Sequence, residues 1–236
     1  IYEWMGAINA LERIRETGAQ TAVLSQSFRF GQTIADNANT ILEMIPSSFL
    51  RLRGSENINS TIGPVNNPRA ILARTNATSV RTVITEQSLG KSAALVGGGQ
   101  EIIRFARAAQ ELMDGQRTEY PELACFETWG EVKEYCLEDK QGAELRLNVK
   151  LVEDFGVQMI VDTLNRSVRE EGADVTVSTG HKSKGREWET VRLAGDFPER
   201  EKMNDSELRL LYVAATRAKN ELDIGSIQIL NSEEGE

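Results

Sequence analysis

The stretch VSTGHKSKGREW at residues 177–188 decides the fold expected for this chain. It begins in a β-branched run over 174–178 that predicts a strand, and it continues as a polar loop bounded by Gly180 and Gly185. The two glycines match the spacing of a phosphate-binding loop, but Arg and Glu follow where such a loop needs Lys and then Ser or Thr. The loop is therefore not a Walker A loop, and the sequence contains no other candidate.

Strands and helices alternate on both sides of this stretch. Apolar residues at 34, 38, 41, 42 and 45 have the spacing of one buried helical face, and Pro46 predicts the end of that helix. Alternating strands and helices predict an α/β fold with a parallel sheet covered on both faces. The other strands are predicted at 21–24, 70–73, 93–96, 190–194 and 222–224, with helices at 77–88 and 206–219.

The middle of the chain has no strand pattern and is predicted to be a helical insertion over 99–171. Residues 51–68 before it are rich in Asn, Ser, Gly and Pro, which predicts a loop. Within the insertion, three groups of residues are expected on buried helical stripes: Ile102, Ile103, Ala106, Ala109 and Met113; Trp129, Val132 and Cys136; Val152, Phe155 and Met159.

Composition excludes several classes of protein. The 236 residues contain no run of about 18 apolar residues and no signal-peptide pattern, so we expect no membrane association and a cytoplasmic location. A net charge of −9 argues against a protein that coats DNA by bulk electrostatics, so any nucleic-acid contact must be local. Two cysteines and one histidine cannot supply the four ligands of a structural zinc site, so we expect no metal site and two reduced thiols.

Four segments, in the same order along the chain, resemble the third to sixth motifs of the UvrD and Rep family of superfamily 1 helicases, most closely its small F-box-DNA-helicase-like members. They are IYEWMGA at 1–7, LSQSFRFG at 24–31, the stretch at 177–188, and LRLLYVAATRAK at 208–219. The resemblance implies a RecA-like parallel sheet without its own P-loop, forming the C-terminal half of a longer helicase. It divides the chain into the end of the third motif and a link over 1–16, a RecA-like domain over 17–98 and 172–228, the insertion, and an acidic tail over 229–236.

The resemblance also assigns residues to a DNA strand. The aromatic residue at the Trp4 position stacks on a base in relatives, and Tyr2 is assigned to the same surface. Thr179 and His181 correspond to residues that touch the DNA backbone, and we assign Lys184 to DNA as well. One departure is Met5, which stands where the family has arginine.

A second group is assigned to the nucleotide by the same resemblance. Phe28 is expected to stack on adenine, Glu187 to bind the ribose, and Arg29 and Arg217 to reach the γ-phosphate as catalytic arginines. ATP and Mg²⁺ themselves are expected mainly on an N-terminal lobe that precedes this chain.

The residues alone leave other interpretations open. Taken alone, Trp4 is more typical of a packing residue. Taken alone, the second segment favours Phe28 and Phe30 as core residues and Arg29 as a surface charge. An ordinary salt bridge remains an alternative for Arg217. In the helix predicted over 206–219, however, Arg217 points away from the apolar stripe of a helix that is apolar on most faces. A buried arginine is costly unless an anion meets it.

The expected function is therefore the C-terminal motor half of an ATP-dependent DNA helicase or translocase. The resemblance implies that the motor moves along single-stranded DNA in the 3′ to 5′ direction. Its expected partners are single-stranded DNA and the N-terminal lobe, and the isolated chain is expected to be monomeric and inactive. DNA repair is one expected process. The alternatives are a non-catalytic nucleic-acid-binding or regulatory module descended from a helicase, and an unrelated α/β enzyme.

Overall fold

A computed structural model describes residues 17–18, 23–46, 48–138, 142–225, 227 and 230. The chain divides into two compact units, the first formed by Ile1–Pro68 with Ser183–Glu236 and the second by Arg69–Lys182. Tyr2, Trp4, Met5 and the acidic tail, apart from Leu230, lie outside the described residues. No helix of the described part is long and apolar enough to cross a membrane.

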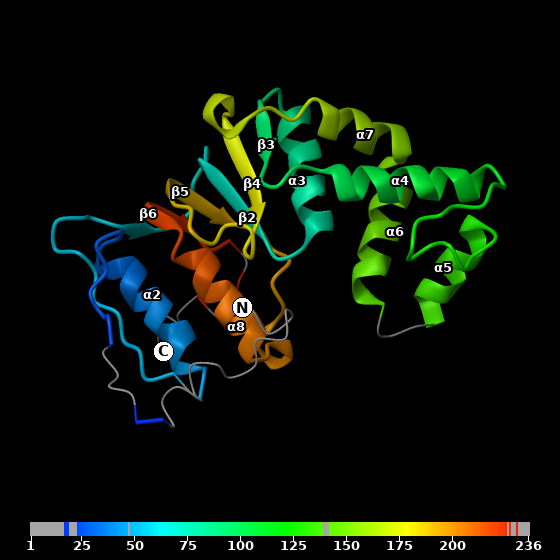
Figure 1. The fold of residues 1–236 in the computed structure, drawn as a ribbon. Coiled ribbons are helices and arrows are strands. Elements are labelled where there is room, and N and C mark those ends of the chain that lie inside the picture. Colours follow the sequence, from blue (N-terminus) through cyan, green and yellow to red (C-terminus); the bar gives the residue numbers. More distant parts are fainter. Residues whose placement is uncertain are drawn as a thin grey trace, which may run out of the picture. The chain divides into compact units, whose positions relative to one another are not determined.

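The first unit contains three parallel strands in the order β1-β6-β5, with β1 at Thr61–Ile62, β5 at Trp188–Leu193 and β6 at Ala218–Asp223. Helices α2 (Gln32–Glu43) and α8 (Asp205–Ala215) pack side by side in this unit, as Figure 1 shows. A short 3₁₀ helix, η3, covers Arg200–Lys202. The spacing read from the sequence is confirmed for α2, because its buried residues include Ile34, Ala38, Ile41 and Leu42.

The second unit contains the parallel strands β2 (Ala70–Ala73), β4 (Val175–Thr179) and β3 (Ala93–Leu95), in that order. Both β2 and β4 are buried along their whole length, which explains the continuous apolar run AILA of β2; in β4, VTVST, the hydroxyl residues are buried as well. The α/β class predicted from the sequence is confirmed. The helices of this unit are α3 (Asn76–Ser88), α4 (Gln100–Met113), α5 (Trp129–Glu138), α6 (Ala143–Phe155) and α7 (Val157–Asn165), with the 3₁₀ helix η2 at Glu170–Gly172.

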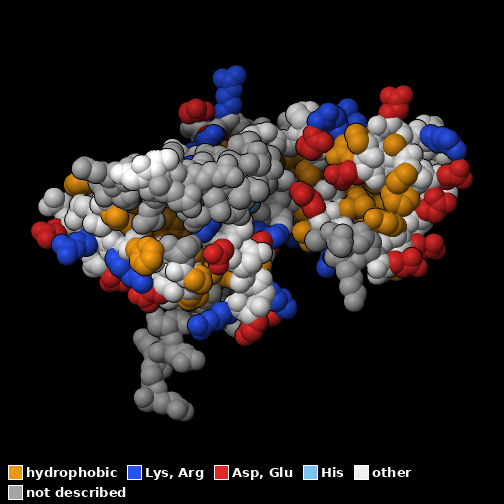
Figure 2. Space-filling model, turned by 60° about the horizontal axis from the view of Figure 1, so that its bottom comes forward, with side chains coloured by type: hydrophobic (Ala, Val, Ile, Leu, Met, Phe, Trp, Pro, Cys, Tyr) orange, Lys and Arg blue, Asp and Glu red, His pale blue; other side chains and the backbone are white. Residues whose placement is uncertain are grey.

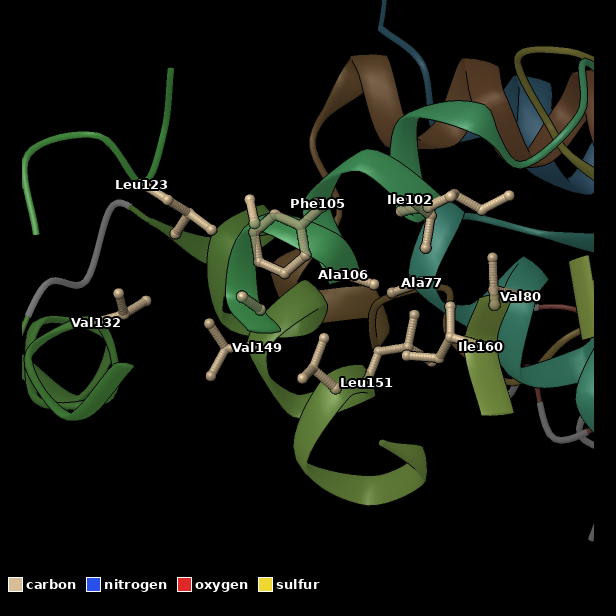
Figure 3. Close-up of a cluster of buried hydrophobic side chains, with 14 of the residues drawn as sticks. Ala77, Val80, Ile102, Phe105, Ala106, Leu123, Val132, Val149, Leu151 and Ile160 are labelled. Atoms are coloured by element: carbon tan, nitrogen blue, oxygen red, sulfur yellow. The ribbon is translucent and has the colours of Figure 1, made fainter. Parts of the chain in front are cut away.

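Side chains from α3 to α7 form one hydrophobic cluster in the second unit (Figure 3). Phe105 lies within it, with its ring edge-on to Tyr120 at 5.7 Å and to Trp129 at 6.4 Å between centroids. The indole N–H of Trp129 donates to Glu153 Oε1 at 2.7 Å, and this hydrogen bond lowers the pKa of Glu153. The indole therefore combines apolar burial with a satisfied polar group. Whether these helices form an insertion with the predicted boundaries stays a prediction.

Several predicted elements are wrong in detail. Val23 and Leu24, the described end of the strand predicted at 21–24, are exposed and lie in no strand, because an apolar run forms a strand only where a neighbour pairs with it. The predicted loop at 51–68 contains β1, which is too short to show a pattern. Met113 and Met159 are exposed rather than buried.

The two methionines and one helix end have local explanations. Met113 is the last residue of α4, where the buried stripe has already ended. Gly156, at φ 73°, separates α6 from α7, so Met159 does not continue the stripe of the preceding helix. The helix predicted at 206–219 ends at Ala215, because strand β6 begins at Ala218.

Candidate functional site

The loop that carries Arg29 is held in the first unit by backbone contacts. Ser27 N donates to Arg53 O at 2.8 Å, and Arg53 N donates to Ser25 O at 2.8 Å. Gly31, at the end of this loop, donates from its backbone N–H to Ser60 Oγ at 2.6 Å, and a Cβ added at Gly31 would lie 2.1 Å from the carbonyl oxygen of Ile58. Only glycine allows this approach of two backbones, so Gly31 fixes where the loop enters α2.

Arg29 makes two contacts with residues far away in the sequence. Its Nε donates to Glu187 Oε2 at 2.7 Å, and its Nη1 donates to the carbonyl oxygen of Thr216 at 3.1 Å. The Arg29 side chain is 31% exposed and that of Glu187 is 49% exposed, so the pair remains accessible from solvent. Arg29 is therefore a partly exposed charge that is paired with Glu187.

Arg217 lies at the junction between α8 and β6, where the helix ends at Ala215 and Thr216 follows as its C-cap. Its backbone N–H donates to Ala214 O at 3.1 Å, and its carbonyl accepts from Trp188 N at 3.0 Å. This second bond begins the pairing of β5 with β6. It brings the residue preceding Trp188, which is Glu187, to the same end of the two strands as Arg217.

The Arg217 side chain is buried, with 8% of the residue exposed. Its guanidinium donates to three neutral oxygens: Nε to Val213 O at 2.7 Å, Nη1 to Arg186 O at 3.2 Å and Nη2 to Thr216 Oγ1 at 3.0 Å. Within the described part of the chain no carboxylate lies within ion-pair distance of it, so the salt-bridge interpretation is not supported. An arginine has five N–H groups, and three are used here.

Electrostatics couple these side chains. Burial, and after it the positive charge of Arg29, lower the pKa of Arg217 to about 10. The hydrogen bond from Arg29 lowers the pKa of Glu187. Two guanidinium groups and one carboxylate thus share a small region, which has an excess of positive charge and suits an anion such as a phosphate.

Phe28 and Phe30, the two aromatic residues of the loop that carries Arg29, differ in burial. Phe30 is buried at 3% exposure, whereas Phe28 is 85% exposed. The interpretation of both rings as core is therefore right for Phe30 and wrong for Phe28. An exposed phenylalanine next to Arg29 offers a flat apolar face in the first unit.

The described residues that are assigned to DNA differ in their exposure to solvent. Thr179 ends β4 in the second unit and is buried, and its hydroxyl accepts from Lys182 N at 3.2 Å. His181 in the second unit and Lys184 in the first are both exposed. On the face drawn in Figure 2, Lys and Arg side chains are interspersed with Asp and Glu, in keeping with local rather than bulk contact with nucleic acid.

Thr216 and Gly31 are functional candidates that reasoning from the sequence missed. Thr216 lies beside Arg217 in the sequence, but only the fold brings Arg29 to its carbonyl oxygen. Gly31 closes the loop motif, yet its close approach to Ile58 is not visible in the sequence. Among the described residues there is no group of three or more His, Cys, Asp or Glu side chains placed to hold a metal ion.

The UvrD-like helicase C-terminal domain family matches residues 174–224, a range that contains Glu187, Thr216 and Arg217. Over these residues the chain is similar to that family. The match confirms the resemblance read from the motifs at 177–188 and 208–219. Within the matched range, β5 and β6 are the two strands that place Glu187 beside Arg217.

Two relatives extend the UvrD-like resemblance over most of the chain. F-box DNA helicase protein 1 of Schizosaccharomyces pombe is 28% identical over 84% of this chain and 26% of its own length. F-box DNA helicase 1 of Gallus gallus is 27% identical over 93% of this chain and 25% of its own length. The chain therefore spans about a quarter of the length of these relatives.

A solved structure is also similar. The C-terminal domain of a possible DNA helicase from Lactobacillus plantarum aligns with 87% of this chain and 92% of its own. The sequence identity is 15% and the TM-score 0.30, which is too low to carry an argument.

Proposed function

We propose that this chain is the C-terminal motor half of an ATP-dependent DNA helicase or translocase. The observation that carries the proposal is the meeting of Arg29 and Arg217 at Thr216, with Glu187 beside them. The UvrD-like family match and the helicase relatives support the same class of protein. ATP and Mg²⁺ would be held mainly by an N-terminal lobe of the same polypeptide.

The residues present fit a triphosphate that approaches from such a lobe. Arg217 has N–H groups to spare and neutral acceptors around it, so a phosphate oxygen would gain a charge-assisted hydrogen bond without breaking an ion pair. Arg29 would exchange Glu187 for a phosphate, which leaves Glu187 able to accept from the ribose. Phe28, exposed on the same loop, would stack on adenine.

These contacts would make closure of the two lobes depend on the γ-phosphate. Bound ATP would keep the two lobes closed through its γ-phosphate, and hydrolysis of ATP would release that phosphate and allow the lobes to open. Arg29 and Arg217 would stabilise negative charge on the transferred group, which is the role of arginine fingers. Thr179, His181 and Lys184 would hold single-stranded DNA together with Tyr2 and Trp4. A 3′ to 5′ direction and a role in DNA repair stay predictions.

The test compares arginine variants in the full-length protein that contains this chain. We expect Arg217→Ala to lower the ATPase rate constant by about 10³-fold or more while ATP binding is retained. The matched control is Arg209→Ala on α8, the helix that ends two residues before Arg217; the Arg209 side chain is partly exposed, and its Nη2 lies 3.9 Å from Asp205 Oδ2. It should change the rate by about twofold at most.

Two results would contradict the proposal. The first is an Arg217→Ala protein that folds and keeps its ATPase activity. The second is measurable ATP hydrolysis by the 236-residue chain alone, which is expected to have none because the lobe that binds ATP is separate. A sequence upstream of this chain without a Gly-Lys-Thr loop after a strand would favour the non-catalytic module instead.

A further inference from the structure

The second unit contains a cavity of about 270 Å³ at the carboxyl ends of β3 and β4. Leu95 and Thr179 line it from the two strands. Glu122, in the turn between α4 and α5, and Glu144 and Asn148 of α6 also line it. Because Glu122, Glu144 and Asn148 have no role in the proposed nucleotide site, the cavity raises a separate question.

Two carboxylates of the lining belong to exposed residues and have no partner of opposite charge among the residues that the structure describes. For Glu122 and Glu144, the described part of the chain supplies neither a hydrogen bond to the side chain nor an ion pair. Burial raises the pKa of Glu122, and the negative charges of Glu144 and Glu101 raise it further. The carboxylates therefore repel one another, which is unfavourable unless a cation compensates them.

The other charged groups of the cavity are already engaged. Glu101 pairs with Arg104 and accepts from the Tyr120 hydroxyl at 3.0 Å. Lys182 Nζ donates to Asn76 Oδ1 at 3.1 Å on the strand side. Neither pair neutralises Glu122 or Glu144, so the cavity lining keeps an excess of negative charge.

Asn148 is the independent observation that points to a ligand. It lies four residues after Glu144 on α6, hence on the same face of the helix, and it lines the cavity with 8% of the residue exposed. Its side-chain amide makes no hydrogen bond with any residue that the structure describes. The residue is largely buried but its amide is open to the cavity, so a ligand there can form the hydrogen bonds that the described residues do not supply.

We propose that this cavity binds the guanidinium group of an arginine side chain on a partner protein. A guanidinium is planar and offers five N–H donors, enough for two carboxylates and the amide oxygen of Asn148. Val80 and Ile102 in the lining would contact the aliphatic part of the side chain. A DNA phosphate is disfavoured because it would face Glu122 and Glu144. The inference rests on the second unit alone and does not depend on the proposed motor function.

The experiment measures binding of short peptides to the 236-residue chain by calorimetry. The probes are an otherwise uncharged peptide with one arginine, the same peptide with citrulline in its place, and agmatine as a free guanidinium compound. We expect saturable binding of the arginine peptide and at least about tenfold weaker binding of the other two, because the charge or the peptide flanks are missing.

Variants connect that binding to the cavity. Glu122→Gln combined with Glu144→Gln should weaken the arginine peptide by about tenfold or more, and Asn148→Ala should weaken it as well. Glu119→Gln is the control, since Glu119 is exposed and does not line the cavity. The double variant should melt at the same or a higher temperature, because a repulsion is removed, so its loss of binding cannot be attributed to unfolding.

Several outcomes would overturn the inference. Equal binding of the arginine and citrulline peptides would show that charge is not recognised. Unchanged binding by the double variant would place the peptide elsewhere, and agmatine binding as tightly as the peptide would contradict a partner protein. Displacement of the peptide by single-stranded DNA, with binding of that DNA lost in the double variant, would assign the cavity to nucleic acid.

Discussion

Arg29 and Arg217 both donate a hydrogen bond to Thr216, the first to its carbonyl oxygen at 3.1 Å and the second to its hydroxyl at 3.0 Å. Two guanidinium groups from distant parts of the sequence are thus tied to one residue. Their mutual repulsion contributes to the lowered pKa of Arg217. The partly exposed carboxylate of Glu187 offsets the repulsion only partly, which leaves the region suited to an additional anion.

Thr216 should be needed for the position of Arg217. Its hydroxyl accepts from Arg217 and donates to Tyr212 O at 2.8 Å, so Thr216→Val leaves both groups without that partner. We expect the free energy of unfolding, measured in urea, to fall by about 1–2 kcal/mol. In the full-length protein the ATPase rate constant should fall too. Thr216→Ser keeps the hydroxyl and should restore both quantities; if Val and Ser variants behave alike, the hydroxyl has no such role.

Glu187 should make the first unit sensitive to acid. Because its pKa in the folded chain lies below the ordinary 4.5, its ion pair with Arg29 contributes stability above that value and loses it as the pH falls through the lowered pKa. Glu187→Gln should therefore be less stable near neutral pH and lose less stability in acid. The measurement is the free energy of unfolding between about pH 3 and pH 7.

A control variant separates this effect from general acid unfolding. Glu56→Gln changes an exposed glutamate of the same unit and should keep the acid dependence of the unmodified chain. A Glu187→Gln protein with an unchanged pH profile would mean that the ion pair with Arg29 does not form in solution.

Phe28 and Phe30 should respond differently to truncation. Phe28→Ala removes an exposed ring and should change the free energy of unfolding by no more than about 0.5 kcal/mol. Phe30→Ala removes a buried ring and should cost about 3–5 kcal/mol. In the full-length protein, Phe28→Ala should raise the KM for ATP. Equal destabilisation by the two substitutions in chemical denaturation would disprove the assignment of Phe28 to the surface.

Gly31 should tolerate no side chain. In Gly31→Ala the new Cβ meets the backbone carbonyl of Ile58, which cannot rotate away, so we expect a loss of about 1–3 kcal/mol or more. Gly63→Ala is the matched control in the same unit, since a Cβ there has no atom within 4 Å. Thermal unfolding of both variants tests the difference. A stable Gly31→Ala protein would refute the close approach of the two backbones.

Much of the fold was predictable because buried elements impose simple patterns. The apolar spacing of α2 and the continuous apolar run of β2 follow from burial on one helical face and on both faces of a sheet. By contrast, the two-residue strand β1 and the break between α6 and α7 at Gly156 were not predicted. Both depend on contacts or backbone angles that a hydrophobic pattern does not record.

For the candidate site, the sequence by itself determined which residue types are present and their order: Phe28, Arg29, Glu187 and Arg217 stand within segments that resemble helicase motifs. Only the tertiary structure decided that Phe28 is exposed while Phe30 is buried, and that Arg29 reaches both Glu187 and Thr216. The reason is physical. Residues close in the sequence show their periodicity directly, whereas contacts between distant segments depend on how the parallel strands and their helices pack.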